Sequence, residues 1–169
     1  MEVTAIIDGL EKNKTVWQGL FSGASPGLQQ WRPGPEKWNL HEVLCHLLDE
    51  ERLDFRARIK HILETPDKTM PCIDPEGWVL EKDYASWDYS KTLIEFLEER
   101  EHSIAYLHSL RDPNWQQNYE HPILGTVTAE MFLYNWLAHE YLHIRQVNRY
   151  HYQFLKESSV IDLSYAGTW

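Results

Sequence analysis

The chain has 169 residues, of which 43% are hydrophobic and 25% charged, and this composition favours one folded domain over a disordered chain. Its 26 acidic and 16 basic residues give a formal net charge of −10, which argues against nucleic acids and anionic membrane surfaces as partners. No apolar run approaches the roughly 18 residues of a membrane span, and the N-terminal segment lacks the pattern of a signal peptide. Because Cys45 and Cys72 are too few for a disulfide framework, we expect free thiols and a cytoplasmic protein.

Four segments repeat apolar residues with the period of an α-helix. They cover, in chain order, residues 3–22, 39–63, 91–111 and 128–155. Asn39 is followed three residues later by Glu42, which resembles a capping box at the start of the second segment. Ser90 is a candidate N-cap for the third segment.

The connections between these segments differ in length. Residues 65–89 contain prolines, a glycine and aspartates, and a connection this long is typical of a crossover or a functional segment. No stretch shows a convincing strand alternation of apolar and polar residues. The pattern therefore predicts an all-α four-helix bundle over residues 1–156, with one or two crossover connections. Residues 157–169 form a tail that we expect to pack on the bundle or on a partner subunit.

Two histidines in the last segment are candidate metal ligands. His139 and His143 are four residues apart, so both rings lie on one helix face and can bind a single ion. They follow Trp136 on the stripe that should be buried, where an imidazole costs free energy unless it has a partner. A metal ion would be a partner for both rings. Hydrogen bonds to carboxylates, or between the rings, are the alternative.

A third ligand should come from another helix, and His46 in the second segment is the best candidate. Three histidines leave one position open for water or substrate, which is the arrangement of catalytic zinc sites. Glu50 lies one turn after His46 and could orient a ligand, act as a base or close the site as a fourth ligand. Cys45 points about 100° away from His46, so we expect it outside the cluster, as a small buried hydrophobe.

Residues 139–143 also match the H-E-x-x-H pattern of zinc proteases, in which Glu140 would be the general base. The extended form of that pattern needs a glycine at position 146 and a histidine at position 149. This chain has Gln146 and Arg149 there, so a protease is a minor alternative.

The remaining histidines share no helix face with these three. We expect them at the surface, which is the usual place of an unpaired histidine. They are His41, His61, His102, His108, His121 and His151.

The chain resembles the DinB-like superfamily of four-helix-bundle proteins. The start of the family's second helix is similar to residues 35–51 (PEKWNLHEVLCHLLDEE), with His46 in a ligand position. The family's loop and fourth helix are similar to residues 121–147 (HPILGTVTAEMFLYNWLAHEYLHIRQV), with His139 and His143 as ligands and Gln146 following. The resemblance implies a three-histidine site for one divalent ion. Zinc is the first expectation, and nickel, iron, cobalt and copper are alternatives.

The resemblance also implies a range of activities. Some members resemble transferases that use bacillithiol or mycothiol, one branch isomerises maleylpyruvate, others are described as metal-dependent hydrolases, and many are homodimers. By analogy we expect the ion to activate a thiol or a water for attack on a small electrophile, in a homodimer. Trp38, Trp136 and the 65–89 connection are candidate pocket walls. The alternative is a non-catalytic, metal-stabilised bundle that acts as a stress-related binding protein.

Overall fold

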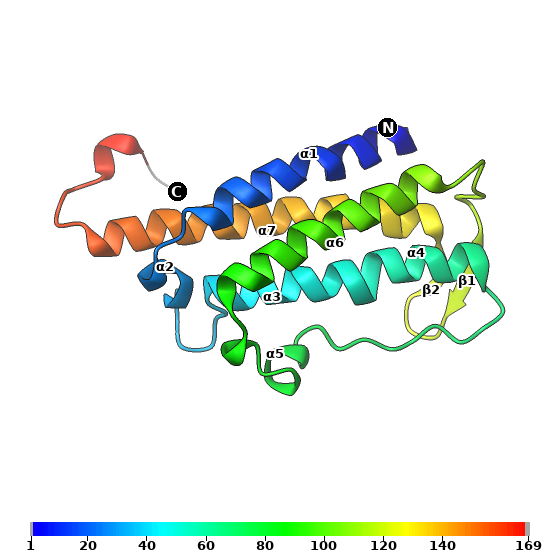
Figure 1. Ribbon diagram of the computed structural model, residues 1–169, viewed down its shortest axis with the longest axis horizontal. Helices are drawn as coiled ribbons and strands as arrows, with labels where there is room; N and C mark the ends of the chain where they lie inside the picture. Colours follow the sequence, from blue (N-terminus) through cyan, green and yellow to red (C-terminus); the bar gives the residue numbers. More distant parts are fainter. Residues whose placement is uncertain (1, 168–169) are drawn as a thin grey trace.

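The computed structural model describes residues 2–167 and confirms the four-helix bundle (Figure 1). The bundle consists of α1 (Val3–Ser22), a second helix formed by α3 (Leu40–Asp49), a π-helical turn (Glu50–Asp54) and α4 (Phe55–Glu64), then α6 (Tyr89–Ser109) and α7 (Ala129–Ser158). Short elements join them: α2 (Pro26–Gln30), α5 (Trp78–Glu81) and 3-10 turns at Tyr84–Ser86 and Ser164–Ala166. Both α6 and α7 contact α1 and the second helix, so α1 and the second helix lie diagonally across the bundle.

The helix starts follow local capping chemistry. Asn39 and Glu42 form the expected capping box, in which the Asn39 side chain accepts from the Glu42 amide at 2.8 Å. Thr128 caps α7 by accepting from the Met131 amide at 3.0 Å. The expected cap at Ser90 is wrong, because Asp88 caps α6 by accepting from the Lys91 amide at 2.7 Å.

The connection between α4 and α6 is the crossover. Figure 1 shows both helices running in the same direction, so the segment between them returns along the bundle. Its second half is held to α3 by Asp49, whose carboxylate accepts from Tyr84 at 2.6 Å and pairs with Lys82 at 2.9 Å. Trp78 packs beside Tyr84 in a small apolar cluster with Cys45. These contacts therefore hold the second half of the connection against α3, the helix that carries His46.

A β-hairpin corrects the expectation that the chain has no strands. The strands β1 (Asn118–His121) and β2 (Gly125–Thr128) pair antiparallel in the connection between α6 and α7. Gly125 has a φ of +73°, a conformation that glycine adopts without strain. Each strand has four residues, and of these eight only Val127 is buried. The strands are therefore too short and too exposed to carry a recognisable alternation of hydrophobic and polar residues.

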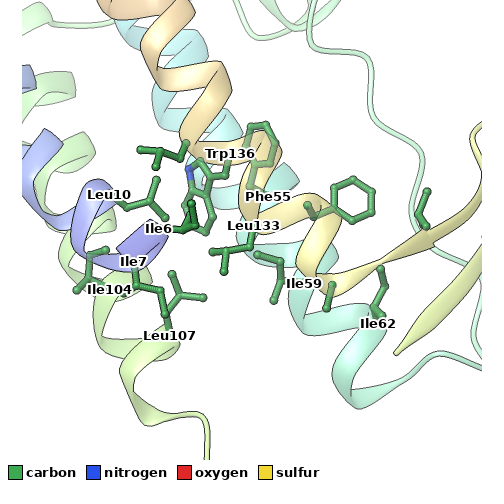
Figure 2. Close-up of a cluster of buried hydrophobic side chains, with 14 of the residues drawn as sticks. Ile6, Ile7, Leu10, Phe55, Ile59, Ile62, Ile104, Leu107, Leu133 and Trp136 are labelled. Atoms are coloured by element: carbon green, nitrogen blue, oxygen red, sulfur yellow. The ribbon is translucent and has the colours of Figure 1, made fainter. Parts of the chain in front are cut away.

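A layer of polar side chains divides the core into two apolar clusters. The cluster nearer the hairpin, drawn in Figure 2, comes from α1, α4, α6 and α7 and contains Trp136 stacked on Phe55. The other cluster surrounds Trp17 and Phe21. The intervening layer includes these buried polar residues from all four long helices: Asn13, Glu50, Glu51, Arg100, Ser103 and Glu140.

The π-helical turn lies in this polar layer. A π turn bonds residue i to residue i+5 and changes the angular spacing of its side chains, and such turns are frequent at functional sites. Leu53, an apolar residue within the helical segment expected over residues 39–63, lies inside the turn and is 42% exposed. The turn leaves Glu50 and Glu51 both buried, although they are adjacent in the sequence.

The tail begins later than expected, because α7 continues to Ser158. Val160, Ile161 and Tyr165 are exposed, and Thr168 and Trp169 lie outside the described residues. Packing of the tail on a partner subunit stays a prediction. Within residues 2–167, no helix combines the length and apolar character needed to cross a membrane.

Candidate metal centre

The structure brings the three predicted histidines together at the level of the polar layer. One ring nitrogen from each of His46, His139 and His143 lies within 4.8 Å of the other two. The Nε2 atoms of His139 and His143 are 3.1 Å apart, and the His46 ring centroid lies 5.6 and 5.1 Å from those of His139 and His143. In the described part of the chain, no other group of histidine, cysteine and carboxylate side chains is gathered in this way.

The electrostatics of the cluster favour neutral imidazoles. Burial and the two neighbouring rings lower the pKa of His46 to about 2, and burial and His143 lower the pKa of His139 to about 3. Burial also lowers the pKa of His143. A neutral imidazole keeps the lone pair that a metal ion needs.

The donor set of the cluster fits a divalent transition-metal ion. The Nδ1 atom of His46 is buried and has no hydrogen-bond partner, which is costly without a compensating ligand or polar group. Three imidazole nitrogens from α3 and α7 converge, and no carboxylate or thiolate belongs to the group among the described residues. If an ion is bound, the three histidines leave a position open.

Aromatic rings border the cluster on two sides. Trp38 lies with its ring centroid 4.8 Å from that of His46. Trp136 is instead buried in the core, where it stacks on Phe55. The ring next to His139 is that of Phe55, at 5.2 Å between centroids. The sequence did not single out Phe55 as a neighbour of the histidines, because an apolar residue within a helical segment carries no signal for it.

Glu50 lies beside His46 without a hydrogen bond to it. Its Oε1 lies 3.9 Å from the Nδ1 atom of His46, and both side chains are buried. Burial, with the nearby Asp54, raises the pKa of Glu50 to about 9. Glu50 is not a member of the nitrogen cluster, and its distance from His46 exceeds that of a hydrogen bond.

Glu140 has a different environment from that of a metalloprotease base. Its carboxylate accepts from the Asn13 side chain at 2.8 Å, from the Trp17 indole at 3.1 Å and from the Arg100 guanidinium. Two of these donors come from α1, which lies diagonally across the core from the helix that carries His46, and the third comes from α6. The carboxylate is therefore occupied by core hydrogen bonds, which disfavours the protease alternative.

Cys45 and His41 are both buried by packing within the fold. Cys45 is buried among Trp78 and Tyr84, and burial with the nearby Asp49 raises the pKa of its thiol to about 12, so it is a poor nucleophile. His41 was expected at the surface and is 3% exposed. Its ring packs edge-on against Tyr89 at 5.5 Å, because the first turn of α3 faces the start of α6.

A groove opens beside His143. It has a volume of about 690 Å³ and lies between the segment before α3 and the outer side of α7, with His143 in its wall. Lys37, Arg145 and Arg149 line it, and no carboxylate does. A neighbouring depression of about 460 Å³ shares Lys37 and carries Glu36 and Glu76. The groove at His143 is thus a cationic surface on a chain with a net charge of −10.

Comparisons with known proteins agree with this architecture. A sequence model of the DinB superfamily matches residues 10–147. Among solved structures, the chain is similar to YfiT from Bacillus subtilis, described as a probable metal-dependent hydrolase with an unusual four-helix bundle topology. The two are 20% identical with a TM-score of 0.80, over 90% of this chain and 87% of YfiT. At this identity the likeness establishes the fold alone. The comparison with curated proteins finds no match.

Proposed function

Because the chain belongs to the DinB superfamily, we propose that it is a metal-dependent enzyme that binds one divalent ion through His46, His139 and His143. The observation that carries the proposal is the convergence of three imidazoles, one buried and two half-buried, whose pKa values are all lowered. Within residues 2–167 no fourth protein ligand joins them. Such a site supports catalysis better than a closed structural site does.

The proposed chemistry is attack by an activated thiol or water on a small electrophile. When bound, a divalent ion lowers the pKa of a water or thiol in its open position and supplies a nucleophile. Glu50 lies buried beside His46 in the π turn, where it would orient a bound ligand. Trp38 and Phe55 border the histidines and limit the access of bulk water.

The cationic groove supports an anionic substrate or cosubstrate. Lys37, Arg145 and Arg149 would hold a carboxylate or phosphate group of the ligand, while His143 in the same groove wall faces the reacting part. Arginine side chains four residues apart on α7 lie on one helix face, so both reach the same ligand. A thiol that carries carboxylates would satisfy this pattern.

The non-catalytic bundle is the second candidate and needs a different site. A purely structural ion is usually enclosed by four protein ligands, and the described residues provide three. The homodimer and the cytoplasmic location that the sequence predicts remain predictions.

Metal content tests the proposal directly. Protein purified without a metal-affinity tag is expected to contain about one ion per chain, because three neutral imidazoles bind first-row divalent metals well. His46→Ala and His143→Ala should each lose the ion while the helical circular dichroism signal persists. His102→Ala, on an exposed side chain of α6, is the matched control and should keep it. A wild-type chain that contains no ion and takes up none on titration would refute the metal site.

Cobalt substitution separates the enzyme from the structural alternative. The visible absorption of the cobalt-loaded protein should change on addition of azide or a small thiol, because the open position accepts an external ligand. A spectrum that neither ligand changes would indicate a closed site and favour the non-catalytic bundle.

A further inference from the structure

A chain of hydrogen bonds leads from His143 to the main chain before α3. The Nδ1 atom of His143 lies 2.7 Å from the Gln146 side-chain oxygen. The Gln146 amide nitrogen donates to the Tyr150 hydroxyl at 2.9 Å, and that hydroxyl donates to the main-chain carbonyl of Trp38 at 3.0 Å. The relay joins two successive turns of α7 to the residue whose ring packs against His46.

The direction of every bond in this relay follows from its last member. A main-chain carbonyl oxygen can only accept, so the single hydrogen of the Tyr150 hydroxyl goes to Trp38. The Tyr150 oxygen must then accept from Gln146, which turns the Gln146 amide nitrogen toward Tyr150 and its carbonyl oxygen toward His143. That oxygen also only accepts. His143 therefore carries its hydrogen on Nδ1.

The consequence appears at the other ring nitrogen. The ring of His143 approaches that of His139 at 3.1 Å, where a neutral imidazole, which holds one hydrogen, is favoured over a charged one. With that hydrogen on Nδ1, the Nε2 atom has a free lone pair, and this atom lies 3.1 Å from the Nε2 atom of His139. The lone pair thus faces the point where the three histidines converge.

We propose that Gln146 and Tyr150 are positioning residues. They fix His143 in its Nδ1–H tautomer by linking it through hydrogen bonds to the main-chain carbonyl of Trp38. This role deepens the proposed metal site, since it presents a ligand atom in the binding form before any ion arrives. Partners of this kind orient ligands and typically change metal affinity by about 10–100-fold. The same relay fixes the backbone of Trp38, whose ring borders His46.

His139 behaves differently from His143 under this proposal. In the metal-free protein its Nε2 atom faces the lone pair of His143 at hydrogen-bond distance, so His139 must carry its hydrogen on Nε2. Binding of zinc through both Nε2 atoms requires that hydrogen to move to Nδ1. Zinc binding should therefore change the tautomer of His139 and leave that of His143 unchanged.

Nitrogen-15 NMR of the histidine side chains tests the relay in the zinc-free protein at pH 7. The wild type should show His143 as the Nδ1–H tautomer and His139 as the Nε2–H tautomer. Gln146→Leu removes the acceptor and should shift His143 toward the Nε2–H tautomer. Gln146→Glu keeps an oxygen acceptor at that position and should preserve Nδ1–H. Asn148→Leu, which removes an exposed amide on the same helix, should change neither ring.

Zinc affinity gives the second readout. Gln146→Leu should weaken binding by about 10–100-fold, and Gln146→Glu should restore it. Tyr150→Phe should have a smaller effect alone and none when added to Gln146→Leu, because both residues act through one relay. Circular dichroism of each variant separates this effect from a loss of folding.

Two results would overturn the relay: a wild-type His143 in the Nε2–H form, or an unchanged tautomer in Gln146→Leu. The NMR measurement needs no metal, so it decides the relay even if the chain binds no zinc. Failure of the metal site would then be seen in the zinc titration of the wild type alone.

Discussion

Arg100→Met is expected to lower the free energy of unfolding by about 3–5 kcal/mol, because it leaves two buried carboxylates without their cation. The Arg100 guanidinium pairs with Glu51 at 2.8 Å and with Glu140, and all three side chains are 2% exposed. It also donates to the main-chain carbonyl of Leu10 at 3.3 Å. A loss of this size is a large part of the total stability of a typical domain, about 5–15 kcal/mol. Urea unfolding followed by circular dichroism measures it.

Two further variants isolate the charge effect from the loss of side-chain volume. Arg52→Met removes an arginine whose bonds to Glu95 and Glu99 lie in a part-exposed position, so its cost should stay below about 1 kcal/mol. Adding Glu51→Gln and Glu140→Gln to Arg100→Met should recover much of the lost stability, since no buried charge then remains unpaired. Equal losses for Arg100→Met and Arg52→Met would contradict the importance of burial.

The helices of this fold could be predicted because their signals are local. The apolar period over residues 3–22 corresponds to α1, and the Asn39 and Glu42 pair marks the start of α3. The three histidines were found for a related reason. His139 and His143 are polar residues on a stripe that should be apolar, and His46 was the best candidate on another helix, which the family resemblance then supported.

The polar core could not be predicted from local patterns, because its partners lie on different helices. Asn13 stands between Leu10 and Trp17 on the buried stripe of α1, and Arg100 stands between Phe96 and Ile104 on that of α6. Each alone looks like a tolerated polar substitution. Only the packing of the helices shows that both lie at the height of Glu140 and donate to it.

The hairpin and the π turn were missed for other physical reasons. The hairpin is short and mostly exposed, so its strands carry little hydrophobic signal. The π turn changes the spacing of the side chains within an otherwise regular helix. Residues 50–54 contain no proline or glycine, so no residue type in the sequence marks the turn. Its position between His46 and Phe55 explains why Glu50 and not Leu53 faces inward.

Stability of the metal-free protein is expected to be greatest near pH 6.5 and to fall on both sides. The folded pKa values of His46 and His139, about 2 and about 3, lie below the ordinary 6.5, and those of His41 and His143 are also lowered. Below pH 6.5 the unfolded chain therefore binds more protons than the folded one, and stability falls as the pH decreases. Each fully shifted histidine contributes about 1.4 kcal/mol per pH unit until its folded pKa is reached.

The opposite limb comes from a buried carboxyl group. Burial raises the pKa of Glu50 to about 9. Above the ordinary carboxyl pKa of 4.5 the folded protein therefore holds protons that the unfolded chain has released, and stability falls as the pH rises toward 9. Between pH 4.5 and 6.5 the lowered pKa values of His46 and His139 outweigh the raised pKa of Glu50, so the histidines determine the sign there. Above pH 6.5 Glu50 determines the slope.

Urea unfolding in the presence of a chelator, from pH 5 to pH 9, measures both limbs. His139→Phe removes one depressed group and should flatten the acid limb by about 1.4 kcal/mol per pH unit, while leaving the alkaline limb unchanged. Glu50→Gln should flatten the alkaline limb and steepen the acid limb, because the glutamate no longer offsets the histidines. His108→Phe, at an exposed position on α6, is the control and should alter neither. An acid limb that keeps its slope in His139→Phe would mean that this imidazole is protonated in the folded protein, and the cluster would then not present the neutral donors on which metal binding depends.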